Sequence, residues 1–381
     1  MEDGNPFRYG APVEGESFCD RREELVGLTG RMRSGIHAFV LSPRRYGKTS
    51  LLLEALRRFR RSGGRGGYAN LLLCTTEDEV AAAVLNAVVR EVLRPVGRAR
   101  QNLEEVLGRL RVTPSVKMGP DGSVSLSFDP SVGAARWIEV REDAAGLLES
   151  SSGRRPATLV LDEFQHVAEV GTGGLGGAFK AVADRVRHGS LVFSGSHLSV
   201  MERLTVGRGA PLLGMGETFR LGVVPEAEMA AHLAERAASA GKVLSEATAR
   251  VLYSRADGIP NDVQWLAHGA FEAAGRSKTI TDATVEAAMA AVVSRQAGLF
   301  AERYEALSAA QQRIVRELAR GPVERVYAKA FLDRVRVANA NAVTTALRAL
   351  SDREIVRRGE ARWQLASPFF RAWLVDQLDP A

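Results

Sequence analysis

Residues 42–49, SPRRYGKT, combine glycine, lysine and threonine in an order that suits phosphate binding. They match the phosphate-loop pattern G-x-x-x-x-G-K-[ST] except at the first position, where Ser42 replaces glycine. In such a loop, backbone N–H groups and the positive end of the following helix hold the phosphates. We expect Lys48 to contact the β- and γ-phosphates and the Thr49 hydroxyl to bind Mg²⁺. Ser42 removes no hydrogen-bond donor, because the missing glycine mainly relaxes the turn.

The rest of the loop completes the nucleotide site that we expect. Backbone N–H groups can come from residues 44–49, whereas Pro43 has none to give. Taken alone, the loop is also compatible with a structural turn that carries a chance Gly-Lys pair. The loop residues expected to contact the nucleotide are Pro43, Arg44, Arg45, Tyr46, Gly47, Lys48, Thr49 and Ser50.

Two carboxylates follow an aliphatic run in TLVLDEF, residues 158–164. Nucleotide hydrolysis at such a loop needs one carboxylate that holds Mg²⁺ and a base that activates water. We expect Asp162 to be the magnesium carboxylate and Glu163 to be the catalytic base. A solvated turn would explain either residue alone, but the two motifs in this order favour a nucleotide site.

A third polar group ends the apolar run LVFSGS, residues 191–196. The carboxyl ends of parallel strands meet at the edge of a sheet where ligands bind. A hydroxyl there can contact the γ-phosphate or orient the attacking water, and we assign this catalytic role to Ser196. A serine-rich loop is an equally good explanation of any single serine in this run.

These motifs lie in segments whose patterns alternate between strand and helix. Short apolar runs predict strands, and longer runs with apolar residues at helical spacing predict helices. Strands are expected at 37–43, 68–74, 157–162 and 190–196, with a β-hairpin insertion at about 112–130 around Pro-Asp-Gly. This alternation predicts an α/β fold with a parallel, doubly wound sheet, and only helices are expected directly after residue 222.

The composition fits a soluble protein of two or three domains. Among 381 residues, 45% are apolar and 25% are charged, and no run of about eighteen apolar residues predicts a membrane span. The polar N-terminus does not resemble a signal peptide. Two cysteines, Cys19 and Cys74, exclude a disulfide scaffold and suit a reducing cytoplasm. The net charge of +6 supports nucleic-acid binding only weakly, since a GC-rich genome also enriches arginine.

The C-terminal part of the chain has the pattern of a winged helix. Helices expected at 308–321, 327–335 and 339–356 lead into two short strands around Gly359. A winged helix that reads duplex DNA places its recognition helix in the major groove and its wing near phosphate. Packing against the nucleotide domain, or binding a protein partner, is the alternative. The DNA contacts would come from Asn339, Asn341, Thr344, Thr345, Arg348, Arg357, Arg358 and Arg362.

The order of FCDRREEL, SPRRYGKTSLL, LVLDEFQ, LVFSGS, DGIP and the winged-helix segment resembles the archaeal-type P-loop ATPases of the STAND/AAA+ group, over essentially the whole chain. The resemblance implies a P-loop NTPase core (1–221), an all-α lid (222–300) and a winged-helix domain (301–381). It also implies ATP or ADP with Mg²⁺ as ligands. Phe18 and Arg21 match the family's F-x-x-R motif near the adenine, and Pro260 matches a lid proline that packs on the base.

Two departures from the family pattern concern turnover. Related lids place an arginine just after the lid glycine, where this chain has Ile259, Pro260 and Asn261. Met215 stands where many relatives carry an arginine near the end of the nucleotide domain. The resemblance therefore implies slow hydrolysis or a nucleotide-held switch, with any arginine finger supplied from elsewhere.

The sequence thus predicts a Mg²⁺-dependent ATPase that acts as a nucleotide-controlled switch, with duplex DNA or a protein as its partner. An oligomer is compatible with this prediction, and a membrane partner is not expected. The alternative is a DNA-binding or adaptor protein whose nucleotide is a structural ligand with little or no turnover.

Overall fold

The computed structural model describes residues 4–92, 115–118, 124–127, 135–152, 155–168, 170, 175–359 and 361–378. They divide into a first unit, Pro12–Gly222, and a second unit that joins Met1–Ala11 to Val223–Ala381. The chain therefore passes between the two units twice. That residues 4–11 belong with the C-terminal part is a feature that the sequence does not indicate.

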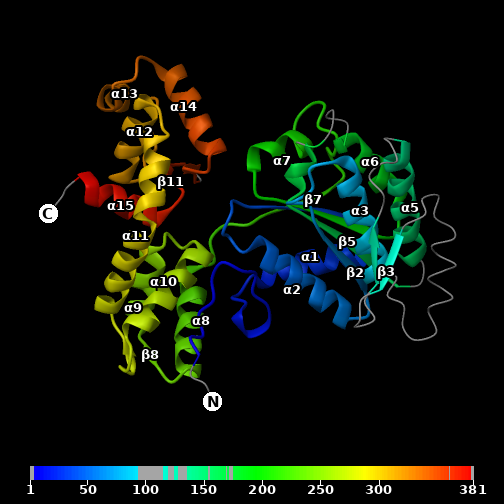
Figure 1. The fold of residues 1–381 in the computed structure, drawn as a ribbon, viewed down its shortest axis with the longest axis horizontal. Helices are drawn as coiled ribbons and strands as arrows, with labels where there is room; N and C mark the ends of the chain where they lie inside the picture. Colours follow the sequence, from blue (N-terminus) through cyan, green and yellow to red (C-terminus); the bar gives the residue numbers. More distant parts are fainter. Residues whose placement is uncertain are drawn as a thin grey trace. The chain divides into compact units, whose positions relative to one another are not determined.

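A parallel five-stranded sheet forms the centre of the first unit (Figure 1). In spatial order its strands are β2 (Arg65–Asn70), β5 (Ala157–Asp162), β6 (Ser190–Gly195), β1 (His37–Leu41) and β7 (Gly216–Arg220). Every neighbouring pair is parallel, so the expected α/β class is confirmed. Because β6 lies between β1 and β5, the strand before the phosphate loop does not pair directly with the strand that carries the two carboxylates.

Helices cover both faces of this sheet because successive strand residues point to opposite sides. On β1, Ala38 and Val40 pack in a cluster with α1 (Arg22–Ser34) and α2 (Lys48–Arg61). Phe39 and Leu41 belong to a second cluster, on the other face, with α3 (Glu77–Ala87), α5 (Ala135–Ser152) and α6 (Leu175–Arg185). The remaining elements of the unit are η1 (Gly15–Ser17), η2 (Val88–Val92), β3 (Ser115–Met118), β4 (Val124–Ser127), η3 (Phe164–Ala168) and α7 (Leu198–Thr205).

The insertion contains an antiparallel pair. Strands β3 and β4 pair with Val116 opposite Leu126, where a hairpin is predicted. The Pro-Asp-Gly segment that motivates that prediction lies outside the described residues.

Strand β2 differs from its prediction, which was wrong about both ends. It spans Arg65–Asn70, whereas the apolar run suggests 68–74. The Asn70 side chain accepts a hydrogen bond from the Leu72 amide at 2.9 Å, and this local turn ends the strand. Leu73 is consequently 86% exposed. Strand β7 was not predicted at all, because Gly216–Arg220 is a polar edge strand without an apolar run.

The second unit begins with a mainly helical part and ends with a winged-helix part. Only helices are predicted directly after residue 222, and the two short strands that pair there, at 243–244 and 279–280, depart from that prediction. The helical part holds α8 (Glu226–Ser239), α9 (Glu246–Arg255), α10 (Pro260–Ala273), α11 (Asp282–Glu305) and the two-residue strands β8 (Val243–Leu244) and β9 (Thr279–Ile280). The winged-helix part holds α12 (Ala309–Ala319), α13 (Lys329–Val335), α14 (Ala340–Asp352), β10 (Val356–Arg358), β11 (Trp363–Leu365) and α15 (Pro368–Leu378). Strands β10 and β11 pair antiparallel and form the wing.

The N-terminal segment is anchored to α10 by aromatic packing and hydrogen bonds. Phe7 is 1% exposed and meets the Phe271 ring edge-on at 6.1 Å. The Tyr9 ring stacks on Trp265 at 5.1 Å. Nδ1 of His268 lies 2.8 Å from the Phe7 carbonyl oxygen, as a donor to it. None of the described helices is long and apolar enough to cross a membrane.

Replacing Phe7 with alanine should destabilise the protein by about 3–5 kcal/mol, because a buried aromatic side chain leaves a cavity. The measurement is urea unfolding, with Leu299→Ala as the control because Leu299 is 44% exposed. Equal unfolding midpoints for the two variants would show that the N-terminal segment is not part of the core.

Candidate functional site

The backbone of the phosphate loop explains why serine replaces glycine at its start. Ser42 is 1% exposed, and its N–H donates to the Gly195 carbonyl of β6. The loop residues with positive φ are Arg45, at 73°, and Gly47, at 83°. Ser42 is not among them, so this position does not require glycine.

Helix α2 begins at Lys48, directly after Gly47. The first N–H groups of a helix have no acceptor within the helix, and they carry the positive end of its dipole. The loop therefore has the geometry of an anion site, because these N–H groups follow the turn that ends β1.

Asp162 is a fully buried carboxylate held by four hydrogen-bond donors. It is 0% exposed and lies at the end of β5. One oxygen, Oδ2, accepts from the hydroxyls of Thr49, at 2.8 Å, and Tyr68, at 2.9 Å. The other, Oδ1, accepts from the Ser194 hydroxyl at 2.7 Å and from the Glu163 amide at 3.0 Å. These bonds compensate the carboxylate for its loss of water.

Glu163 is held beside Asp162 by three other side chains. Lys48 Nζ lies 2.9 Å from Glu163 Oε1 and 3.8 Å from Asp162 Oδ1. The Ser196 hydroxyl donates to Glu163 Oε2 at 2.8 Å, and the Gln165 amide donates to the same oxygen. The backbone of Glu163 is left-handed, with φ of 55°, a strain of a kind that concentrates at functional sites.

Glu163 and Tyr68 differ in protonation state at this site. Burial would raise the pKa of Glu163, but the positive charge of Lys48 and the bonds from Gln165 and Ser196 lower it overall. The pKa of Tyr68 is raised by burial and by the negative charge of Asp162, so its phenol keeps the proton. Glu163 is therefore an ionised base, and Tyr68 is a neutral donor.

The protein atoms at this site fit a magnesium ion bound with a nucleotide. Mg²⁺ prefers hard oxygen ligands, and it usually keeps several waters while using one or two protein groups plus phosphate oxygens. The Thr49 hydroxyl and the Asp162 carboxylate are such oxygens, and they lie 2.8 Å apart at the start of α2. Lys48 beside them provides the cation that phosphate requires.

The structure brings together Lys48, Thr49, Asp162, Glu163 and Ser196, as the sequence motifs require. Sequence reasoning missed three residues that hold the carboxylates: Tyr68, Gln165 and Ser194. Ser194 could have been found, because it lies two residues before Ser196 in the same motif, near the end of β6. Nothing in the local sequence around Tyr68 points to Asp162.

Other residues that are predicted to contact the nucleotide form hydrogen bonds within the protein. Arg21 is 6% exposed, and its guanidinium donates to the carbonyls of Tyr46, at 3.3 Å, and Gly222, at 2.5 Å. The Ser50 hydroxyl accepts from the Val13 amide at 3.0 Å. Arg21 thus stabilises the phosphate loop, and Ser50 holds the segment that precedes α1. Phe18 is half-buried against the α1–α2 cluster, whereas Arg44 and Arg45 are exposed.

Pro260 belongs to the second unit, where it is the first residue of α10. The turn before it is left-handed at Asp257 and Gly258, with φ of 51° and 65°. A side chain at Gly258 would lie 2.5 Å from the Tyr253 ring, so glycine is required there. Arg371 of α15 holds Asp257 with two bonds, of 2.8 and 3.1 Å, and so ties this turn to the winged-helix part. Contact between Pro260 and a nucleotide stays a prediction.

Several of the predicted DNA contacts are already engaged within the fold. Asn339 caps α14 by accepting from the Ala342 amide at 3.0 Å. Arg362 pairs with Glu324 at 2.8 Å, and Arg357 lies 3.9 Å from Asp257. Among the other predicted contacts, Asn341, Thr344, Thr345, Arg348 and Arg358 are exposed, and the hydroxyls of Thr344 and Thr345 donate to carbonyls of the preceding helical turn at 3.0 Å.

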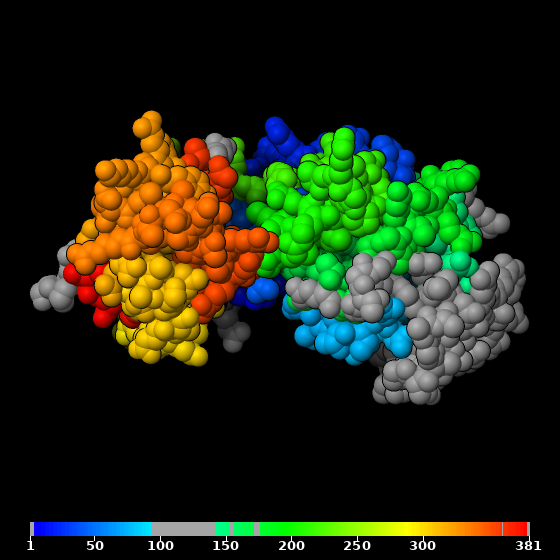
Figure 2. Space-filling model, turned by 90° about the horizontal axis from the view of Figure 1, so that it is seen from above, coloured from blue at the N-terminus to red at the C-terminus, as the bar shows by residue number. Residues whose placement is uncertain are grey.

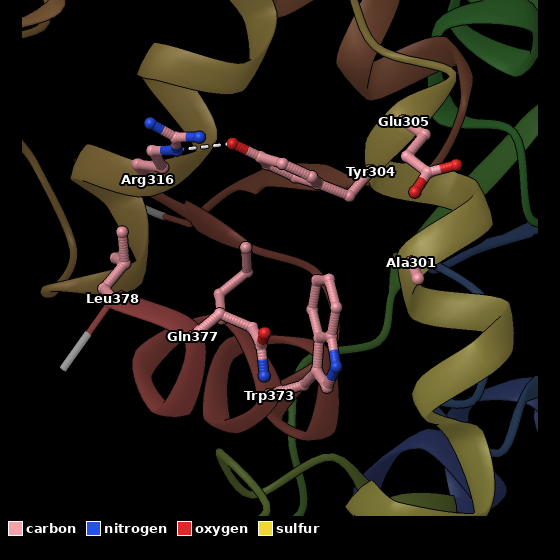
Figure 3. Close-up of a pocket in the computed structure, with 8 residues that line it drawn as sticks. Ala301, Tyr304, Glu305, Arg316, Trp373, Gln377 and Leu378 are labelled. Carbon is pink, nitrogen blue, oxygen red and sulfur yellow. Dashed lines mark hydrogen bonds between the residues drawn. The ribbon is translucent and has the colours of Figure 1, made fainter. Parts of the chain in front are cut away.

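A separate cleft of about 270 Å³ lies in the second unit between α11, α12 and α15 (Figure 3). Tyr304 and Trp373 form its aromatic walls, with ring centroids 6.1 Å apart. Arg316 donates to the Tyr304 hydroxyl at its rim. No residue that the sequence predicts for nucleotide binding lines this cleft.

Comparisons with known proteins bear on the fold of the chain. A family model described as a probable winged helix domain matches residues 298–376. The structure is similar to the Walker-type ATPase paby2304 of Pyrococcus abyssi, at 16% identity and a TM-score of 0.67 over 97% of this chain and 99% of that one. The ORC2 protein of Aeropyrum pernix is similar at 15% identity and a TM-score of 0.59, over 100% and 97% of the two chains.

The ORC1 protein of the same organism, solved in complex with DNA, is similar at 17% identity and a TM-score of 0.51, over 96% and 94% of the chains. No curated protein matches the sequence. At these identities the likeness establishes the fold. The chain therefore has the same fold as this Walker-type ATPase and these ORC proteins, a parallel-sheet P-loop core, and a winged helix follows it toward the C-terminus, as the sequence predicts.

Glu54 connects the phosphate-loop helix to the chain segment that precedes α1. It is 1% exposed, and it accepts from Arg57 and Arg58 at 2.7 Å and from the Gly15 amide at 3.5 Å. Burial would raise the pKa of Glu54, but these donors lower it to about 2. Because the folded-state pKa lies below the unfolded value, the resulting stability is present above pH 4.5 and is lost as the pH falls toward 2.

The substitution Glu54→Gln should therefore lower the free energy of unfolding at pH 7, and this deficit should shrink as the pH is lowered to about 3. Urea unfolding of both proteins across this range measures the difference. A deficit that is independent of pH would mean that the Glu54 charge does not stabilise the fold.

Proposed function

We propose that the protein binds ATP with Mg²⁺ and hydrolyses it to ADP and phosphate. The observation that carries this proposal is the contact network of Lys48, Thr49, Asp162, Glu163 and Ser196 at the ends of three strands. These groups are a phosphate-binding cation, two oxygen ligands for magnesium, a base and a hydroxyl. Each of these groups has a role in phosphoryl transfer to water.

Lys48 would exchange its ion-pair partner when a nucleotide binds. In the structure its ammonium group pairs with Glu163 and lies near Asp162. A β- or γ-phosphate that attracts Lys48 would release one oxygen of Glu163 from its ion pair. That oxygen can then accept a proton from the attacking water, while Ser196 and Gln165 keep the other oxygen oriented. When bound, Mg²⁺ neutralises charge on the phosphates.

We further propose that turnover is slow and that the bound nucleotide sets the state of a STAND-like switch. The support is Met215 and Asn261, which stand where related ATPases carry arginines. An arginine that stabilises the charge of the transition state is worth about 10³–10⁵ in rate. Until such an arginine is supplied from elsewhere, the protein therefore holds ATP long enough for a partner to respond to it.

The substitution Glu163→Gln should retain nucleotide affinity and reduce hydrolysis by at least about 100-fold, because the amide cannot accept the proton from water. Phosphate release at saturating ATP and Mg²⁺ measures the rate, and equilibrium titration with a fluorescent nucleotide measures affinity. The matched control is Glu202→Gln, which removes a surface carboxylate paired with Arg220. Hydrolysis by Glu163→Gln at the wild-type rate would remove Glu163 from the mechanism.

Duplex DNA is the partner that the winged-helix part favours. Residues 298–376 contain fourteen lysines and arginines and nine acidic residues. The net charge of this part is therefore +5, whereas that of the whole chain is +6. Exposed residues 341, 344, 345 and 348 of α14 have the spacing of a single helix face, opposite the buried Val343 and Leu347. Figure 2 shows the orange residues of α13 and α14 as a continuous part of the surface. Such a face suits the major groove.

Replacing both Arg348 and Arg358 with alanine should weaken duplex binding. It should also reduce the slope of log affinity against log salt by about one for each phosphate that the variant no longer neutralises. Fluorescence anisotropy over a range of salt concentrations measures both quantities. Arg255→Ala is the control, since Arg255 is also exposed but pairs with Glu286 outside the winged-helix part. Equal DNA affinity for the double variant and the wild type would favour a protein partner.

A further inference from the structure

Tyr68 reaches the magnesium carboxylate from a neighbouring strand. In the register of β2 and β5, Tyr68 lies opposite Val160, and Asp162 is two residues further along β5 on the same face. A diagonal pair of this kind is within reach of an aromatic side chain. The Tyr68 hydroxyl spans that separation and donates to Asp162 Oδ2 at 2.9 Å. Its ring packs beside the α1–α2 cluster, on the side of the sheet from which Thr49 approaches.

The two oxygens of Asp162 are held in different ways. Oδ1 is fixed by Ser194 and by the neighbouring backbone amide of Glu163. Oδ2 is shared by Thr49 and Tyr68. Thr49 is itself a predicted magnesium ligand. Of the two donors to Oδ2, Tyr68 is therefore the one that is not predicted to bind the metal directly.

We propose that Tyr68 is a positioning residue for magnesium: its hydroxyl fixes the Asp162 carboxylate in the orientation in which the metal is held beside Thr49. This inference rests on the proposed nucleotide site but not on its turnover. Donors that orient metal-binding groups typically change metal affinity by about 10–100-fold when they are removed. Phenylalanine would keep the ring that packs against the cluster and would remove only the hydroxyl.

The experiment is a magnesium titration of fluorescent-ATP binding by wild type and Tyr68→Phe. The variant should need about 10-fold more Mg²⁺ to reach half of the magnesium-dependent gain in nucleotide affinity. In EDTA, the two proteins should bind the nucleotide equally. This equality separates positioning of the metal from general damage to the loop, which would weaken binding in both conditions.

Two further variants complete the test. Tyr327→Phe removes the hydroxyl of a tyrosine that is 51% exposed, and it should titrate as wild type does. Ser194→Ala removes a donor to the other oxygen of Asp162, and it should shift the magnesium midpoint in the same direction as Tyr68→Phe.

An unchanged magnesium midpoint in Tyr68→Phe would overturn the proposal, as would equal losses of nucleotide affinity with Mg²⁺ and in EDTA. A wild-type affinity that does not depend on Mg²⁺ would overturn it as well. If wild type binds nucleotide in a magnesium-dependent way but releases no phosphate, the proposed hydrolysis fails and the role of Tyr68 is still decided by the titration.

Discussion

The buried charge of Asp162 is the constraint on which the site depends. A carboxylate with no exposed surface must be surrounded by donors, and here they come from α2, β2, β6 and the residue after Asp162 in the chain. Satisfying this one group therefore fixes the ends of three strands and the start of the phosphate-loop helix relative to one another. Lys48 and Glu163 then meet as a consequence, at 2.9 Å.

The same constraint explains which parts of the site could be predicted from sequence. Lys48, Thr49, Asp162 and Glu163 lie in two short contiguous motifs, and the chemistry of their side chains defines their roles. Tyr68 could not be predicted, because its role depends on the register between β2 and β5. Ser42 looks like a defect in the sequence, but the backbone shows that Arg45 and Gly47 hold the left-handed conformations.

The fold was predictable to a similar degree and for similar reasons. The four buried strands were found from their apolar runs, although the bounds of β2 were wrong because Asn70 ends that strand earlier than the run does. The exposed edge strand β7 gave no such pattern, since its pairing with β1 comes from the tertiary fold. The packing of Phe7 and Tyr9 on α10 joins residues more than two hundred positions apart, and local patterns carry no information about it.

The central claim is that this network turns over ATP, and a single-turnover experiment tests it most directly. Labelled ATP is mixed with excess wild-type protein, and the bound nucleotide is analysed over time with Mg²⁺ and with EDTA. The account predicts a slow conversion of bound ATP to ADP and phosphate that occurs only with Mg²⁺. Recovery of intact ATP from the magnesium complex would contradict it and would make the nucleotide a structural ligand.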